Sequence, residues 1–224
     1  HLGSMKNKKN LLYLNLGLGI GCGIISNGRI YRGVNNKAGE LGHTIVVPNG
    51  EQCSCGNRGC LETVASGWAL DKIIKEKLLS GEKSEVLDLC NGNLEKLDDK
   101  IIFKAYTNGD KLINEVLDTA NNYLCIGIAN FINLFNPEII VLGGKFAIFG
   151  DKFINKLKKD IKKYIMPVLY DEVKFITSSY NDNAASLGAT TMVRDSYFYI
   201  DIIKKHLMYK KMQYSIGWKN LGGD

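Results

Sequence analysis

The sequence predicts an α/β protein whose mixed sheet begins as an antiparallel meander and continues with parallel strands. Three short apolar runs separated by glycine turns come first, and the second and third are joined at Asn27-Gly28, a dipeptide typical of hairpins. Helical patterns follow and alternate with two further apolar runs. Because parallel strands require long connections, the later helices are expected to cross over between neighbouring strands.

The meander is expected at residues 11–16, 21–26 and 29–32, where apolar residues are separated by glycines. The segment 34–60 has no sustained periodicity, so it is predicted to be a long loop. Loops of this length inside a compact domain are usually functional, which directs attention to its side chains.

Helical periodicity starts at Leu61, and Asp110 is a good N-cap for the longest helix. Asn136-Pro137 ends that helix, and the apolar run behind it closes on two glycines. The later elements are expected as helices at 61–79, 96–106 and 110–135, a strand ending at Gly143-Gly144, a helix at 145–165, a strand at 172–178 and a helix at 181–207. This order corresponds to one lobe of an actin-like, ribonuclease-H-like architecture.

The bulk composition predicts a soluble, cytoplasmic globular protein. The chain has 224 residues, 45% of them hydrophobic, and no apolar run approaches the roughly 20 residues that a membrane-spanning helix requires. Its net charge of +6 comes largely from lysines scattered over helical stretches, which indicates solvated helix faces rather than a nucleic-acid surface. The opening residues 1–4 are typical of an expression-tag remnant, with Met5 as the expected native start.

Three of the six cysteines form a cluster behind a histidine, in the stretch HTIVVPNGEQCSCGNRGC. A disulfide is disfavoured because Cys53 and Cys55 are too close in sequence to bridge without strain, and because a cytosolic protein has no reason to keep one. Three thiolates with the imidazole of His43 suit a tetrahedral structural zinc site, with unligated cysteines as the alternative. The predicted ligands are His43, Cys53, Cys55 and Cys60, and the cysteines expected in the core are Cys22, Cys90 and Cys125.

Two carboxylates flank this loop: Glu40 precedes His43, and Glu62 follows Cys60. A metal ion would draw the ends of the loop together and bring the two carboxylates close to each other. Three thiolates and one divalent ion carry a formal charge of about −1, which repels an anion and suits a neutral ligand that donates hydrogen bonds, such as a sugar. The alternative is that both residues are ordinary exposed acids.

The stretch GELGHTIVVPNGEQCSCGNRGCLETVASG resembles the signature of the ROK family, named for repressor, open reading frame and kinase. GLGIGCGIISNGRIYRG before it, and NLFNPEIIVLGG and NDNAASLGA after it, extend the resemblance over about residues 10–190. It implies a carboxy-terminal ROK lobe at residues 5–190 with its zinc loop at 43–60. Residues 191–224 have no matching family segment and are expected to form a helical tail.

The resemblance also implies roles for individual residues. His43 and the three clustered cysteines correspond to the family's zinc ligands. Glu40, His43 and Glu62 correspond to side chains that contact the hydroxyls of a bound hexose. The glycines that correspond to the second phosphate-binding loop of the kinases and to the turn beneath the adenosine are Gly17, Gly19, Gly21, Gly143 and Gly144. ATP and Mg²⁺ are implied only if the parent protein is a kinase.

Two departures from the kinase pattern matter. The chain begins at the second phosphate-binding loop, so the amino-terminal lobe with the general-base aspartate is expected to be absent and no catalytic residue is expected in this chain. The sequence NDNAAS at 181–186 resembles the family's catalytic motif, but its place near the end of the chain matches another family segment. Asp182 is therefore expected to cap a helix rather than to act as the general base. Leu18 stands where the kinases usually carry a threonine, so a hydroxyl that could bind phosphate is missing.

The predicted function is therefore that of a sugar-binding, zinc-containing lobe of a sugar-responsive transcriptional regulator. The alternative is an ATP-dependent, glucokinase-like sugar kinase whose catalytic lobe is missing, and a third class is a structural domain that binds zinc but no sugar. The resemblance implies a homodimer. It implies DNA contact only through a helix-turn-helix segment that this chain lacks.

Overall fold

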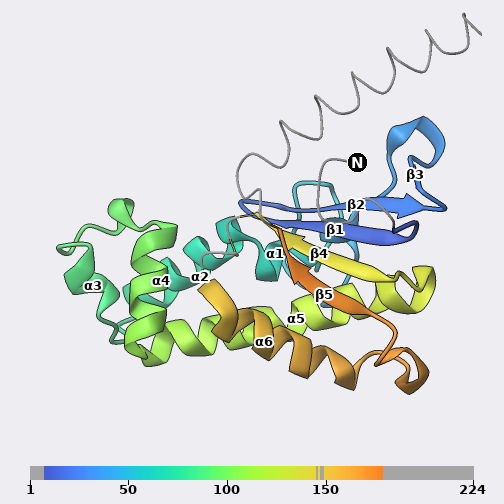
Figure 1. Ribbon diagram of the computed structural model, residues 1–224. Helices are drawn as coiled ribbons and strands as arrows, with labels where there is room; N and C mark the ends of the chain where they lie inside the picture. The colour runs from blue at the N-terminus through green and yellow to red at the C-terminus, as the bar shows by residue number, and fades with distance from the viewer. Residues whose placement is uncertain (1–7, 145, 147–148, 179–224) are drawn as a thin grey trace, which may run out of the picture. The chain divides into compact units, whose positions relative to one another are not determined.

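The computed structural model describes residues 8–144, 146 and 149–178, and its centre is a five-stranded mixed sheet in the order β3-β2-β1-β4-β5 (Figure 1). β1 pairs antiparallel with β2 and parallel with β4, and β4 pairs parallel with β5. The predicted meander followed by two parallel strands is confirmed. The strand bounds are β1 Leu11–Leu16, β2 Ile20–Ser26, β3 Arg29–Ile30, β4 Ile139–Gly143 and β5 Lys174–Thr177.

Two long helices, α5 and α6, lie along one face of the sheet (Figure 1). The helix bounds are α1 Glu62–Ala65, α2 Gly67–Leu79, α3 Val86–Leu89, α4 Asp99–Asn108, α5 Lys111–Phe135 and α6 Gly150–Asp160. Asp110 caps α5 as predicted, because its Oδ1 accepts the N–H of Ile113 at 3.0 Å. None of the helices in the described part of the chain is both long and apolar enough to cross a bilayer.

The core joins the central strand to the apolar stripe of α5. Leu12, Leu14 and Leu16 alternate along β1 and are fully buried in one cluster with Leu124 and Ile128 of α5. Each such side chain contributes about 1.5–3 kcal/mol when it leaves water. Cys90 and Cys125 lie in this cluster as predicted, whereas Cys22 is only partly buried at its edge.

The helix predicted at 61–79 is in fact two helices, because the chain breaks at Ser66. Ser66 has an extended backbone (φ −81°, ψ 162°), and its hydroxyl accepts the N–H of Ala69, which starts α2 as a separate helix. The short helix α3 and a 3₁₀ turn at Leu94–Lys96 were not predicted. β3 ends at Ile30 rather than at residue 32, and α6 occupies only part of the predicted 145–165.

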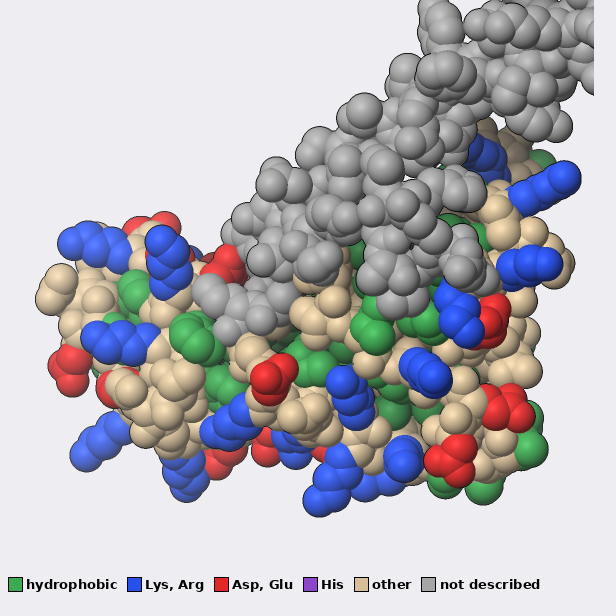
Figure 2. Space-filling view, viewed as in Figure 1, with side chains coloured by type: hydrophobic (Ala, Val, Ile, Leu, Met, Phe, Trp, Pro, Cys, Tyr) green, Lys and Arg blue, Asp and Glu red, His purple; other side chains and the backbone are tan. Residues whose placement is uncertain are grey.

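The surface charge agrees with the prediction of solvated helix faces. Figure 2 shows Lys and Arg side chains spread over one face of the molecule, with acidic side chains between them. Several of these lysines are paired; Lys156, for example, lies 3.2 Å from Asp160. The predicted tag remnant at 1–4, the helix at 181–207, the cap at Asp182 and the tail at 191–224 lie outside the described residues, and the predicted domain boundaries stay predictions.

Candidate metal centre and pocket

The loop at 34–60 folds back so that residues 44–45 meet residues 60–61. Thr44 O accepts the N–H of Leu61 at 2.9 Å, and Ile45 forms an antiparallel bridge with Cys60. The loop contains only short 3₁₀ turns, Val34–Asn36 and Leu41–His43, as its lack of periodicity predicts. The residues that follow His43 therefore lie beside the residues that lead into α1.

Glycine is required where this loop approaches another chain segment. Gly59 has φ +74°, and a Cβ built there would lie 1.7 Å from Val47 O. Gly39 has φ +90°, and its Cβ would lie 1.9 Å from Cys22 O on β2. Neither position can carry a side chain without moving the backbone, so these two glycines fix the path of the loop.

The four predicted metal ligands come together in space. The candidate ligand atoms of His43, Cys53, Cys55 and Cys60 all lie within 4.8 Å of one another. His43 Nδ1 is 3.5 Å from Cys53 Sγ, and Cys55 Sγ is 3.6 Å from Cys60 Sγ. With Zn–S bonds of about 2.3 Å, ligands at two corners of a tetrahedron lie about 3.8 Å apart. The four groups therefore fit a tetrahedral metal ion.

The electrostatics of the cluster also suit a cation. Burial, followed by the neighbouring thiols of Cys55 and Cys53, raises the pKa of the Cys60 thiol to about 12. The pKa of Cys55 is lowered, chiefly by a hydrogen bond with the backbone of Asn57. A buried thiol gives up its proton readily only when a metal ion binds the sulfur. Cys60 would therefore become a thiolate when a metal ion binds it.

Glu62 is held at the amino-terminal end of β2. Its Oε2 accepts the backbone N–H of Ile20 at 3.1 Å. A Cβ at Gly19 would lie 2.6 Å from the same oxygen, so the carboxylate reaches this amide because residue 19 has no side chain. Gly19 thus has a structural role in positioning Glu62, whatever ligand the loop holds.

Glu40 and His43 flank a glycine that contacts β2. Gly42, between them in sequence, packs so closely that a Cβ would lie 2.3 Å from Ile20 O. His43 directs Nδ1 to Cys53, while its Nε2 lies 4.0 Å from Glu40 Oε2. The ring can therefore serve a metal ion with one nitrogen and a ligand beside Glu40 with the other.

A pocket of about 300 Å³ lies against Glu62, within the range of small-ligand sites. Sequence reasoning missed most of its lining, including Trp68 at the first turn of α2. The available signal was the Ser66-Gly67 pair, since serine is a strong N-cap and marks a helix start. The lining residues are Leu18, Gly19, Gln52, Cys53, Ser54, Glu62, Thr63, Ser66 and Trp68.

Of the glycines expected to hold a nucleotide, Gly17, Gly143 and Gly144 lie at the carboxyl ends of the parallel strands β1 and β4. Gly143 pairs with Asn15, and a Cβ at Gly144 would lie 2.4 Å from Leu16 O. Gly17 forms a tight turn in which its N–H donates to Gly19 O at 3.0 Å. Gly21 lies within β2 and has no atom within 4 Å of a built Cβ, so no close contact requires glycine there.

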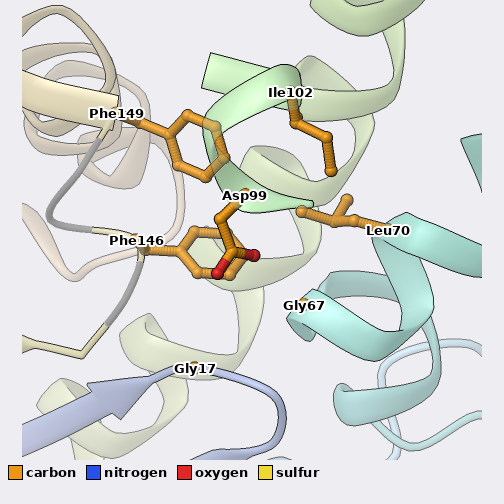
Figure 3. A pocket seen from close by; sticks show the side chains of 7 residues that line it. All are labelled: Gly17, Gly67, Leu70, Asp99, Ile102, Phe146 and Phe149. Carbon is orange, nitrogen blue, oxygen red and sulfur yellow. The ribbon is translucent and has the colours of Figure 1, made fainter. Parts of the chain in front are cut away.

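Buried aromatic side chains lie beside the first of these glycines. Phe146 and Phe149, which follow Gly144, are buried and converge with Leu70 and Ile102 on the space beside Gly17 (Figure 3). The cavity that remains there measures only about 10 Å³, about enough for one water molecule.

Comparison with known proteins gives both regulators and kinases. A glucokinase from Thermotoga maritima is 34% identical over 193 residues, which are 86% of this chain and 61% of that protein. A xylose repressor from Caldicellulosiruptor bescii is 34% identical over 184 residues, which are 82% of this chain and 46% of that protein. The chain thus spans about half the length of the curated relatives it matches.

Solved structures divide in the same way. A ROK family glucokinase from Streptomyces griseus, in complex with glucose and AMPPNP, is 26% identical with a TM-score of 0.77, covering 85% of this chain and 62% of that one. A ROK family transcriptional regulator, described as a homologue of the E. coli MLC protein, is 34% identical with a TM-score of 0.67, covering 75% and 41%. The family model described as ROK matches residues 1–196. The chain belongs to the ROK family.

Proposed function

We propose that this chain is the sugar-binding, zinc-containing lobe of a cytoplasmic, sugar-responsive transcriptional regulator. The observation that carries the proposal is the pocket whose lining includes the Glu62 carboxylate, which accepts a backbone N–H, and Cys53 of the Cys₃His cluster. The relatives include repressors as well as glucokinases, so an ATP-dependent sugar kinase is the second candidate.

In this proposal the carboxylates accept hydrogen bonds from the hydroxyls of a neutral sugar. Glu62 Oε2 is engaged by Ile20 N–H, and no hydrogen bond to Oε1 occurs among the described residues, so Oε1 is assigned to a ligand hydroxyl. Glu40 and the Nε2 of His43, which lie 4.0 Å apart and do not line the 300 Å³ pocket, would supply a further acceptor and donor. These hydrogen-bonding groups suit a polyol and disfavour an anion.

Zinc is the metal that best fits the cluster, because three thiolates and one imidazole are its usual structural ligands. When bound, it would stabilise the fold of the loop and keep the thiols deprotonated, with no open position for hydrolytic chemistry. His43, Cys53, Cys55 and Cys60 would hold it. Through His43, the same ion would orient the imidazole toward the sugar.

One feature favours the regulator over the kinase. Leu18, on the loop expected to hold phosphate, offers no hydroxyl and leaves an isobutyl group largely exposed. A kinase uses such a loop to position ATP-Mg²⁺, whereas a regulator does not need it.

A regulator would act by population shift. Sugar bound between this lobe and a second lobe would favour a closed state, and the closed state would differ in its affinity for DNA. The DNA-binding segment and the second lobe are assigned to parts of the parent protein outside this chain. We further assign a homodimeric state, which sedimentation of the purified chain would test.

The proposal is tested by calorimetric titration with a sugar panel and with ATP. The panel contains D-glucose, D-galactose, D-xylose, L-arabinose, 6-deoxy-D-glucose, D-fucose and N-acetyl-D-glucosamine. At least one sugar is expected to bind, and Glu62→Gln is expected to weaken that binding at least tenfold, since it removes the charged acceptor. Glu115→Gln, an acid on α5 outside the pocket lining, is the matched control.

Three results would contradict the proposal in different ways. Absence of heat with every sugar would remove the sugar-binding function. Equal affinities of the wild type and Glu62→Gln would remove Glu62 from its role. Measurable ATP-Mg²⁺ binding to this chain, with a dissociation constant in the millimolar range or below, would favour the kinase instead.

A further inference from the structure

The pocket has one apolar side. Leu18 and Trp68 line it together with Glu62 and are 67% and 53% exposed, respectively. We call these two side chains the apolar rim. Large apolar side chains exposed at the edge of a pocket that also holds a carboxylate indicate a ligand with both polar and apolar parts.

The apolar rim is held in place by main-chain hydrogen bonds. The N–H of Trp68 donates to Leu18 O at 3.2 Å, and the N–H of Gly67 donates to Gly17 O at 2.8 Å. These amides are at the start of α2, where helix N–H groups have no partner within the helix. The two rim residues are therefore tied to each other by the backbone and do not depend on their own side chains for position.

The Trp68 ring also has a cation on one side. Lys72 Nζ lies 5.6 Å from its ring centroid, and Lys72 forms an ion pair with Glu51 of the loop at 43–60, which we call the metal loop. These contacts connect the Trp68 ring to the metal loop through Lys72.

Four neutral polar side chains line the pocket, and three of them, Gln52, Thr63 and Ser66, have partners within the chain, while Ser54 is exposed. Thr63 Oγ1 donates to Cys60 O at 2.7 Å, and Ser66 Oγ accepts from Ala69 N–H at 3.1 Å. A ligand hydroxyl pushed against Leu18 would lose hydrogen bonds to water, and the carbon atoms there would not replace them. A methyl group or a hydrogen atom at that place would lose nothing.

In a pyranose, the group that extends furthest from the ring is the exocyclic substituent. With Glu62 on hydroxyls of the ring, this substituent is the part assigned to the apolar rim. In a hexopyranose this substituent is a hydroxymethyl group, in a 6-deoxyhexose a methyl group, and in a pentopyranose a hydrogen atom. These three sugars differ in no other group.

We propose that Leu18 and Trp68 make this pocket selective for neutral sugars whose exocyclic group is apolar or absent, namely 6-deoxyhexoses and pentoses. The inference rests on the proposed sugar-binding function. It adds the ligand class and two specificity-determining residues that the metal cluster and the carboxylates do not supply.

The test compares matched sugars by calorimetry in two stereochemical series: D-glucose, 6-deoxy-D-glucose and D-xylose, and D-galactose, D-fucose and L-arabinose. In a series that binds, the deoxy sugar or the pentose is expected to bind about tenfold or more tightly than the hexose, the range for one misplaced group in an apolar site. Leu18→Thr, which supplies a hydroxyl, is expected to bring this ratio close to one. Trp68→Ala is expected to reduce it as well.

The matched control is Leu134→Thr, which makes the same change at a leucine that is 77% exposed at the end of α5. It should leave the ratio unchanged, and thermal melts will show whether the rim variants are folded. Equal or tighter binding of the hexose, binding of N-acetyl-D-glucosamine alone, or an unchanged ratio in both rim variants overturns this inference and leaves the proposed function standing. Absence of binding by every sugar overturns both.

Discussion

At the scale of single residues, the metal loop depends on positions that carry no side chain. Gly59 is the strongest case, because φ is +74° and a Cβ would collide with Val47 O. Gly56 has a similar φ of +96° but open space around it. Comparing substitutions at Gly59 and Gly56 therefore separates the energetic cost of a left-handed backbone from the cost of a steric clash.

We predict that Gly59→Ala loses most of its bound zinc, because the loop cannot close around the ion. Gly56→Ala should keep its zinc and lose only about 1–2 kcal/mol of stability, the cost of a side chain in the left-handed region. Metal content by inductively coupled plasma mass spectrometry and thermal unfolding check both values. Equal zinc content in the two variants would show that the clash is not decisive.

How well sequence predicts a site residue depends on how distinctive its chemistry is. Three cysteines and a histidine in one loop have few other uses, so the cluster could be predicted from type and spacing. The amide of Ile20, which positions Glu62, could not, because a backbone donor leaves no mark in the sequence. Trp68 could not either, since an aromatic residue near a helix start more often belongs to the core.

At the scale of elements, the start of α2 joins stability to the pocket. Ser66 caps the helix, and the next two amides hold the loop that carries Leu18. Asp98 caps α4 in the same way, by accepting the N–H of Ile101, but its helix has no residue in the 300 Å³ pocket. The two N-caps can therefore be compared, because they have the same role in their helices and only Ser66 lies at the pocket.

Ser66→Ala and Asp98→Ala are each predicted to cost about 1 kcal/mol of stability, the usual value of an N-cap. Only Ser66→Ala should also weaken sugar binding, severalfold, because it loosens the pocket wall. Urea unfolding gives the first quantity and calorimetry the second. Similar sugar affinities for both variants would mean that the cap supports the helix alone.

Element boundaries were predictable where local signals agree. α5 begins behind an aspartate cap and ends at Asn136, whose φ of 41° is left-handed, followed by a proline. The break at Ser66 was missed because helical periodicity continues on both sides of it. The path of the loop at 34–60 could not be predicted, because it is set by contacts with β2 and by the closure between Thr44 and Leu61.

At the scale of the whole molecule, the mixed sheet could be predicted as a class, but its strand order could not. β1 and β4 are adjacent although more than 100 residues separate them, and only tertiary packing decides that pairing. The core formed by β1 and α5 also includes Leu41 and Leu61, which flank the metal loop. Metal binding is therefore expected to be coupled to the stability of the fold as a whole.

Removal of the metal with a chelator is predicted to lower the melting temperature by about 5–10 °C, which for a chain of this size corresponds to a few kcal/mol. Most of the helical circular dichroism at 25 °C should remain, because the described helices lie outside the loop. Added Zn²⁺ should restore the melting temperature, and Mg²⁺ should not. A chain purified with less than half an equivalent of metal, and with an unchanged melting temperature after chelation, would contradict the metal site.

The main-chain attachment of residues 18 and 68 has a consequence for how this lobe can change over evolutionary time. Their positions are fixed by the bonds from Gly67 and Trp68 to the preceding loop, and neither bond involves a side chain. Both side chains are largely exposed, so replacing them leaves the buried core intact. Ligand preference can therefore drift by single substitutions at these two positions, while the fold and the metal centre are inherited unchanged.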